Sequence, residues 1–364
     1  MANYTEIDDP SAFFQTTLYT GTGSSLVVTN GGNSDLQPDL VWLKPRGIAE
    51  GHFLTDSVRG VQKTIRSYRD NAEETESQGL TAFSSDGFTM GTNSDINTDD
   101  EPGVAWQWKT GTAFSNDASS TSVGSIDTAG SVNTTAGFSI IGWTGTAENA
   151  TLAHGLGVVP QWIIVKNRGA ATSWRVYHHK NTAAPETDHL VLDTTAATAD
   201  DDSMWNDTAP TSSVFSLKTS SSVNSDGVNY IAYCFAEKQG YSKFGSYTGN
   251  DNANGPFVYL GFKPAWIMIK RTDTENTSSN MNGSHWVMLD NKRDTINTAG
   301  AAHALTANRK DAEDTSNLTN VDFLSNGFKF RGGADAVNAS AAYVFMAFAE
   351  NPFVTSTGIP ATAR

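Results

Sequence analysis

The chain has 364 residues and a formal net charge of −15 at pH 7, with 39 acidic side chains against 24 basic ones. A surface this acidic repels nucleic-acid phosphates, so the charge argues against a protein that binds DNA or RNA. The length allows two to four domains of about 100–200 residues each. Abundant Gly, Ser, Thr, Asn and Asp favour short strands between turns over long helices.

The single cysteine, Cys234, excludes an intramolecular disulfide. It lies in the apolar run 230–235, which indicates a buried strand rather than a catalytic thiol. The first six residues have neither the basic start nor the apolar core of a signal peptide, and no stretch approaches the roughly 18 apolar residues of a membrane span. We therefore expect a protein that is made in a cytoplasm and does not insert into a membrane.

In chain order, residues 1–14 indicate an N-terminal extension, after which one set of sequence blocks recurs three times. The first block is an aromatic-Thr-Gly turn, at Tyr19, Trp143 and Tyr247. The second is a proline followed by a short apolar strand and then a lysine, over 38–44, 160–166 and 264–270. Because proline cannot donate to a strand ladder, it fits the first position of each strand.

The third block pairs two aromatic strands at a fixed distance of 20 residues, from Phe88 to Trp108, from Phe215 to Phe235 and from Phe328 to Phe348. The distance between the second and third blocks varies, because Lys44, Lys166 and Lys270 precede these phenylalanines by 44, 49 and 58 residues. Fixed spacings are typical of paired strands, and variable ones of surface loops.

We therefore predict an all-β chain of three tandem homologous antiparallel β-sandwich or jelly-roll domains. Six or more short strands are expected in each unit. The predicted units are repeat 1 (15–110), repeat 2 (137–240) and repeat 3 (241–353), with a Ser/Thr/Gly-rich linker at 111–136 and a C-terminal tail at 354–364.

No residue is a candidate catalytic, cofactor-binding or metal-binding group. Neighbours on a strand point to opposite faces, so His178 and His179 would not chelate one metal. The segment 95–99 is similar to the opening of an EF-hand loop, but Asp100 and Trp106 stand where that loop needs Gly and Glu. We interpret it as a solvated acidic turn, with a low-affinity Ca²⁺ loop as the alternative, and apply the same interpretation to 200–202.

Two further residue classes were weighed as functional groups. Glu237 and Glu350 directly follow apolar strands, and we interpret them as strand-end caps rather than as a glycosidase pair. Most of the nine tryptophans occupy matching strand positions, which indicates core packing. Trp205 is the exception, because it lies in a polar loop of variable length in repeat 2, so it is our candidate surface contact residue.

The quoted blocks resemble repeat domains in virion structural proteins of marine bacteriophages, which are described as tail-fibre-like. The segments that carry this resemblance are residues 39–44, 52–60, 135–146, 154–157, 160–168 and 347–353. It covers residues 15–353 and implies no catalytic motif. The acidic charge and the lack of cysteine pairs fit a virion assembled in a reducing bacterial cytoplasm.

The resemblance implies a non-enzymatic virion surface protein, and we prefer a tail-fibre or receptor-binding adhesin that attaches to host surface polysaccharide. The alternative is a capsid decoration or head-fibre protein seated on the phage shell. A depolymerising tailspike is the third hypothesis, and neither a parallel β-helix pattern nor a catalytic acid cleft is visible for it. The expected partners are other virion proteins, and by analogy with phage appendages we expect a homo-oligomer.

Overall fold

The computed structural model describes residues 4–279, 281–295, 297, 303–316 and 319–362. This part of the chain is almost entirely antiparallel β-structure, which confirms the predicted all-β class. The helical elements in it are single turns: η1 (Pro10–Ala12), α1 (Ser94–Asn97), α2 (Ala118–Thr121) and α3 (Asp202–Trp205). Among the described residues, no helix has the length and apolar character needed to cross a membrane.

Repeat 1 contains a four-stranded sheet in the order β1-β9-β3-β4 and a three-stranded sheet in the order β2-β8-β7, with the short pair β5-β6 beside them. The strands are β1 (Phe14–Thr20), β2 (Leu26–Thr29), β3 (Leu40–Pro45), β4 (Phe53–Asp56), β5 (Lys63–Thr64), β6 (Glu74–Thr75), β7 (Leu80–Ser84), β8 (Gly87–Met90) and β9 (Pro102–Trp108).

Repeat 2 lies in an eight-stranded sheet in the order β10-β11-β12-β19-β14-β15-β16-β17, which is accompanied by the pair β13-β18. The strands are β10 (Thr112–Asn116), β11 (Thr128–Asn133), β12 (Phe138–Thr144), β13 (Ala150–Ala153), β14 (Trp162–Asn167), β15 (Arg175–His178), β16 (Asp188–Val191), β17 (Ala199–Asp200), β18 (Val214–Leu217) and β19 (Asn229–Phe235).

Repeat 3 has a five-stranded sheet in the order β20-β27-β22-β23-β24 and a three-stranded sheet in the order β21-β26-β25. The strands are β20 (Ser242–Thr248), β21 (Phe257–Tyr259), β22 (Phe262–Arg271), β23 (Trp286–Asp290), β24 (Leu305–Thr306), β25 (Val321–Leu324), β26 (Gly327–Phe330) and β27 (Ala342–Pro352).

The three large sheets place the recurring blocks identically. The aromatic-Thr-Gly strand pairs with the last strand of its repeat, which also pairs with the Pro-to-Lys strand. The registers agree too, because Thr16, Ile140 and Phe244 lie opposite Trp106, Tyr233 and Met346. The two fixed spacings of the sequence therefore correspond to strands that are neighbours in one sheet.

The segment 111–136 is not an open linker, because it forms β10, α2 and β11. Strand β11 pairs with β12 and extends the large sheet of repeat 2. Phe114 and Ile126 pack against the core of that repeat. Its small polar residues suggested a linker, yet small side chains are equally compatible with an added strand whose main stabilisation is backbone hydrogen bonding.

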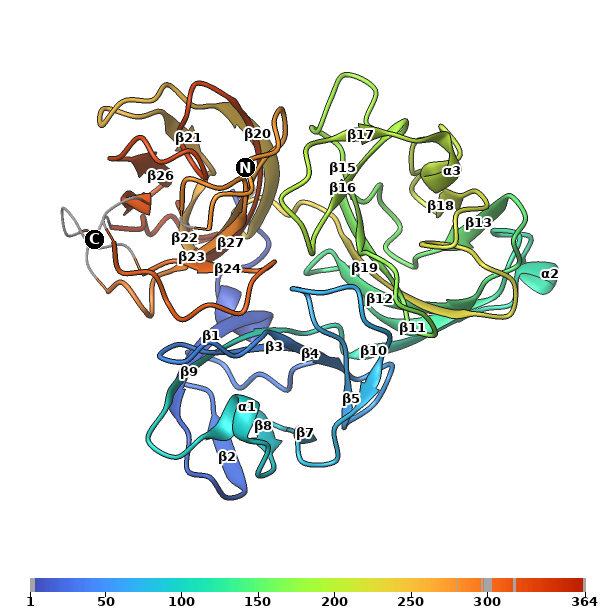
Figure 1. Ribbon diagram of the computed structural model, residues 1–364, viewed down its shortest axis with the longest axis horizontal. Coiled ribbons are helices and arrows are strands. Elements are labelled where there is room, and N and C mark those ends of the chain that lie inside the picture. Colours follow the sequence, from blue (N-terminus) through green and yellow to red (C-terminus); the bar gives the residue numbers. More distant parts are fainter. Residues whose placement is uncertain (1–3, 280, 296, 298–302, 317–318, 363–364) are drawn as a thin grey trace.

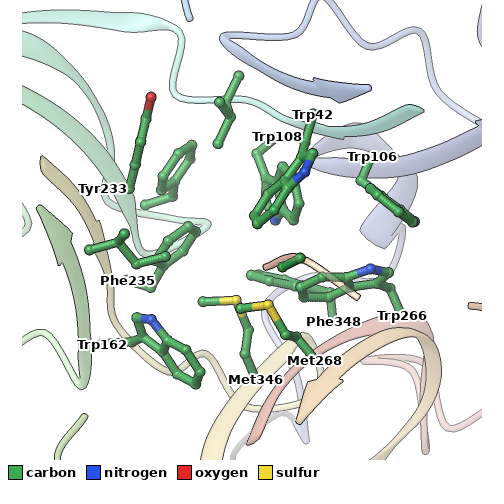
Figure 2. Packing of buried hydrophobic residues seen from close by; sticks show 14 of the residues in the cluster. Trp42, Trp106, Trp108, Trp162, Tyr233, Phe235, Trp266, Met268, Met346 and Phe348 are labelled. Atoms are coloured by element: carbon green, nitrogen blue, oxygen red, sulfur yellow. The ribbon is translucent and has the colours of Figure 1, made fainter. Parts of the chain in front are cut away.

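Each repeat buries a hydrophobic cluster between its own two sheets, and a fourth cluster lies where the three repeats meet. Figure 1 shows the three lobes arranged around this common centre, and Figure 2 shows side chains from all of them converging there. Trp42 and Trp108 come from repeat 1, Trp162 from repeat 2, and Trp266 and Phe348 from repeat 3. The sequence pattern did not predict this shared core.

Both ends of the chain are attached to repeat 3 (Figure 1). Thr5 donates from Oγ1 to the Gln239 carbonyl at 3.0 Å, and Ser356 donates its backbone N–H to Asp8 Oδ1 at 2.7 Å. The tail was expected to be loosely held, but its described part folds back through a backbone bond of 2.8 Å from Ala361 N to Phe353 O. Residues 1–3 and 363–364 lie outside the described part.

Candidate functional site

The polar side chains that the sequence analysis weighed as chemistry lie mainly in the contacts between repeats. At one recurring position a ring nitrogen reaches a backbone carbonyl of the next repeat. Trp174 Nε1 donates to Arg66 O at 3.0 Å and Trp286 Nε1 donates to Val191 O at 2.9 Å. His52 Nε2 lies 3.0 Å from Thr306 O. The three contacts join repeat 2 to 1, 3 to 2 and 1 to 3, so the ring of repeats is closed head to tail within one chain.

A buried aspartate–arginine pair lies beside this contact in two of the three interfaces. In repeat 1, Arg59 Nε lies 2.5 Å from Asp56 Oδ2, and both side chains are fully buried. Tyr233 of repeat 2 donates its hydroxyl to the same oxygen at 2.7 Å. In repeat 3, Arg293 Nε lies 2.6 Å from Asp290 Oδ2, which accepts the Trp106 indole N–H of repeat 1 at 3.0 Å.

Each of these pairs continues into a second ion pair that also crosses the interface. Arg168 of repeat 2 donates to both carboxylate oxygens of Glu73, at 2.9 and 3.0 Å. Arg46 of repeat 1 contacts Glu313 in the same manner, with 2.7 Å from Nη2 to Oε2. Although burial alone would raise the pKa of Glu313, hydrogen bonds from Arg46 and the charge of Arg293 hold that pKa below its usual value.

The interface between repeats 2 and 3 keeps the backbone contact and lacks these charges. Thr198 N donates to Thr272 O at 2.9 Å, where the other interfaces have Glu73 N to Arg168 O and Glu313 N to Arg46 O. His178 stands at the position of Asp56 and Asp290, with Nε2 3.4 Å from Phe345 O. Burial lowers the pKa of His178 to about 3, so its imidazole is neutral near pH 7.

The lysine that ends each Pro-to-Lys strand is buried in these contacts. Lys166 Nζ donates to the carbonyls of Asp70, Asn167 and Thr172 at 2.8–3.0 Å. Lys270 Nζ reaches Thr195 O of repeat 2 at 3.2 Å and Ser284 O at 2.9 Å. Burial lowers the pKa of Lys44 and Lys166 to about 8 and that of Lys270 to about 7.

The prediction that Trp205 is a surface contact residue is wrong. Trp205 ends α3, is 2 % exposed and donates its indole N–H to Asp188 O at 3.0 Å. Its ring lies edge-on to Tyr177, with centroids 6.1 Å apart. Asp201 caps the helix by accepting from Ser203 N at 2.9 Å, and the resulting single turn directs the indole into the core of repeat 2. The polar sequence around Trp205 concealed this turn.

The acidic segment 95–99 lies in and after the short helix α1. Asp95 Oδ2 faces Arg66 Nη1 at 3.4 Å, and the buried Asn97 amide donates to Gly91 O at 2.7 Å. Across the described ranges, no group of three or more His, Cys, Asp or Glu is arranged to hold a metal ion. His178 and His179 contact different carbonyls, those of Phe345 and Phe244.

The cysteine and the two strand-end glutamates also have structural surroundings. Cys234 is buried, and burial raises the pKa of its thiol to about 12. Glu237 Oε1 accepts the backbone N–H of Phe244 at 2.8 Å, and Glu350 lies 3.4 Å from Lys263 Nζ. These contacts match caps at strand ends.

One surface differs from the rest because it exposes aromatic rings. Phe257 and Tyr259 on β21 are 45 % and 49 % exposed, and among the described residues they are the exposed Phe, Tyr or Trp side chains. Their cross-strand partners on β26 are Lys329 and Gly327, and glycine leaves the Tyr259 ring uncovered on that side. The corresponding positions are Val27 and Thr29 in repeat 1, and Thr151 and Ala153 in repeat 2.

A polar groove of about 410 Å³ adjoins these rings. Its wall includes Tyr4, Glu237, Gln239, Lys243 and Tyr259. The Tyr4 hydroxyl donates to Gly261 O at 2.8 Å and lies 3.3 Å from the Tyr259 hydroxyl. Lys243 Nζ lies 5.3 Å from the centre of the Tyr259 ring and donates to Tyr259 O at 2.9 Å. We call the rings of Phe257 and Tyr259 together with this groove the repeat 3 aromatic surface.

The repeat 3 aromatic surface combines exposed rings with hydroxyl, amide, carboxylate and ammonium groups. Rings of this kind stack on apolar faces of a ligand, while the surrounding groups hydrogen-bond to its polar edge. Sequence reasoning missed it, although the signal was present: aligning the repeats on Phe88, Phe215 and Phe328 gives aromatics on this strand in repeat 3 alone.

The fold and contacts define a closed all-β ring of three related units. Residues 9–352 match the family described as Domain of unknown function (DUF7483), and the chain belongs to that family. None of the curated proteins compared with the chain matches it.

Proposed function

We propose that the protein is a non-enzymatic surface protein of a bacteriophage virion and acts as an attachment protein that binds host surface polysaccharide. The observation that carries this proposal is the repeat 3 aromatic surface, with Phe257 and Tyr259 exposed beside a polar groove. A pyranose ring offers an apolar face to an aromatic ring and hydroxyls to the polar groups around it. The resemblance to tail-fibre-like domains supports the same function.

The non-enzymatic part of the proposal rests on how the reactive side chains are used. The buried carboxylates Asp56 and Asp290 are bound to arginines, and the buried lysines to backbone carbonyls. General acid–base chemistry needs such groups to face a substrate, and these face another repeat.

The proposal is tested by the binding of the purified chain to an array of bacterial surface polysaccharides. We expect binding to at least one of them, and a loss of about tenfold or more in Tyr259→Ala, because stacking on one ring contributes on the order of 1–3 kcal/mol. The matched control is Thr29→Ala, at the corresponding position of repeat 1. Equal binding by both variants, or release of sugar from the polysaccharide, would contradict the proposal.

A capsid decoration or head-fibre protein is the second candidate, and the closed ring favours it. Three repeats that share one central core form a compact body rather than an extended fibre. Labelling the protein on the virion for electron microscopy separates the two, since an attachment protein should lie on the tail and a decoration protein on the head.

A further inference from the structure

The first strand of each large sheet has an outer edge, and the three repeats treat that edge differently. Lys109 N donates to Phe13 O at 3.0 Å and Gly21 N to Glu101 O at 2.8 Å, both in register with β1 and β9. In an antiparallel pair alternate residues face away from the partner, so the backbone groups of Thr16, Leu18 and Thr20 point outward from β9.

The same edge is filled in repeat 2. There β11 pairs with β12, and Ser131 lies opposite Ile140 and Ala129 opposite Gly142. Ile140 and Gly142 correspond to Thr16 and Leu18 by their register on the neighbouring strand.

The edge is partly closed in repeat 3, by two side chains. Phe244 N donates to Glu237 Oε1 at 2.8 Å, and Phe244 O lies 2.6 Å from His179 Nε2. In repeat 1, the described residues include no partner for the backbone groups of Thr16, Leu18 and Thr20. Leu18 and Thr20 are exposed. From Phe14 to Thr20 the strand has no charge, proline or bulge, which are the devices that usually protect an edge.

We propose that the outer edge of β1 accepts an extended strand from a partner polypeptide. A row of outward N–H and C=O groups is recognised by another extended backbone, as in β-strand addition. The strand that fills the corresponding edge, β11, has the sequence Thr-Ala-Gly-Ser-Val-Asn, so the incoming segment has small uncharged side chains.

A groove at the start of β1 selects a single strand over the edge of a second folded copy. It measures about 300 Å³, and Gln15, Thr16 and Gly32 line it together with Lys292 and Asn351 of repeat 3. These walls flank the edge at Thr16, so one extended segment fits between them and a whole sheet would collide with them.

The test is hydrogen exchange of the full chain with and without a synthetic peptide of residues 126–135, which contains the β11 sequence. We expect the amides of Leu18 and Thr20 to exchange about tenfold more slowly with the peptide at millimolar concentration. Leu18→Pro removes the outward N–H and should abolish the protection. Ser246→Pro, at the matching position of β20, should leave it intact.

Leu18→Lys serves as a second variant, because an exposed lysine blocks edge pairing without removing a backbone donor. Absence of protection, or protection that persists in both Leu18 variants, would overturn the proposal. Concentration-dependent protection of Leu18 without peptide, accompanied by dimers in sedimentation, would overturn it in favour of a second copy of this chain.

Discussion

Two of the three contacts between repeats are ionic and the third is neutral, although their backbone geometry is the same. Asp56 and Asp290 anchor the contacts of repeat 1 with repeats 2 and 3, respectively, whereas His178 takes the corresponding place between repeats 2 and 3. All three share the bond from a ring nitrogen to a carbonyl and the backbone bond beside it. The backbone contacts and the shared apolar core therefore suffice to build an interface, and the charges are an addition to it.

The difference also bears on how the ring closes in one order. Buried ion pairs are weak evidence for stability, because desolvation offsets much of their attraction. Removing one partner is costly, since the other is left as an unpaired buried charge. A repeat that met the wrong neighbour would leave Arg59 or Arg293 in that condition. We therefore expect the charges to contribute to the correct pairing of repeats as well as to its strength.

The largest expected effect comes from removing the aspartate of an ionic contact. Asp56→Ala leaves the buried Arg59 guanidinium without its carboxylate and the Tyr233 hydroxyl without its acceptor, so it should lower the free energy of unfolding by about 3–5 kcal/mol. Asp290→Ala should behave alike. Guanidinium denaturation followed by tryptophan fluorescence measures the loss.

His178→Ala is the matched control in the neutral contact. It removes one long hydrogen bond and some packing, so about 1–2 kcal/mol is expected. Equal losses in Asp56→Ala and His178→Ala would show that the ionic and neutral contacts do not differ energetically in the way inferred here.

The neutral contact should be the one most sensitive to acid through its histidine. The pKa of His178 is about 3 in the fold, against an ordinary value of 6.5, so between these pH values the unfolded chain binds a proton that the fold does not. Stability should therefore fall as the pH drops through this window, by about 2 kcal/mol from pH 7 to pH 5 for this group. His178→Asn should flatten the slope of unfolding free energy against pH, and an unchanged slope would contradict the assignment.

The buried lysines should produce a smaller effect of the opposite kind in alkali. The pKa of Lys166 is about 8 in the fold and 10.5 ordinarily, so above pH 8 the unfolded chain holds more protons and stability should rise with pH. We expect about 1 kcal/mol per lysine between pH 7 and pH 9. Lys166→Met should remove one such contribution.

The lysine experiment should stop at pH 9. Burial raises the pKa of Cys234 to about 12 from an ordinary 9, so above pH 9 the thiol makes stability fall with pH. A wild-type curve that is flat from pH 7 to pH 9 would contradict the lysine prediction.

The smallest stability effect is expected on the repeat 3 aromatic surface, away from the contacts between repeats. Tyr259→Ala removes a half-exposed ring and should change the free energy of unfolding by about 0.5 kcal/mol or less. Thermal denaturation measures it. A loss comparable with that of Asp56→Ala would mean that Tyr259 supports the ring rather than a ligand site.

The sequence alone determined the strand scaffold of this protein. The Pro-to-Lys runs and the paired aromatics became adjacent strands because fixed spacing and alternating apolar residues depend on local geometry and on which face is buried. The apolar surroundings of Cys234 likewise indicated its burial correctly.

Tertiary structure decided what each buried face packs against. An apolar strand position looks the same whether it faces its own sandwich or a neighbouring repeat, so the shared core and the burial of Lys166 were invisible in the sequence. Polar flanks suggested that Trp205 was exposed, but a capped helical turn directs it inward. The pattern of a sequence specifies which side chains avoid water, and only the meeting of distant segments specifies their partners.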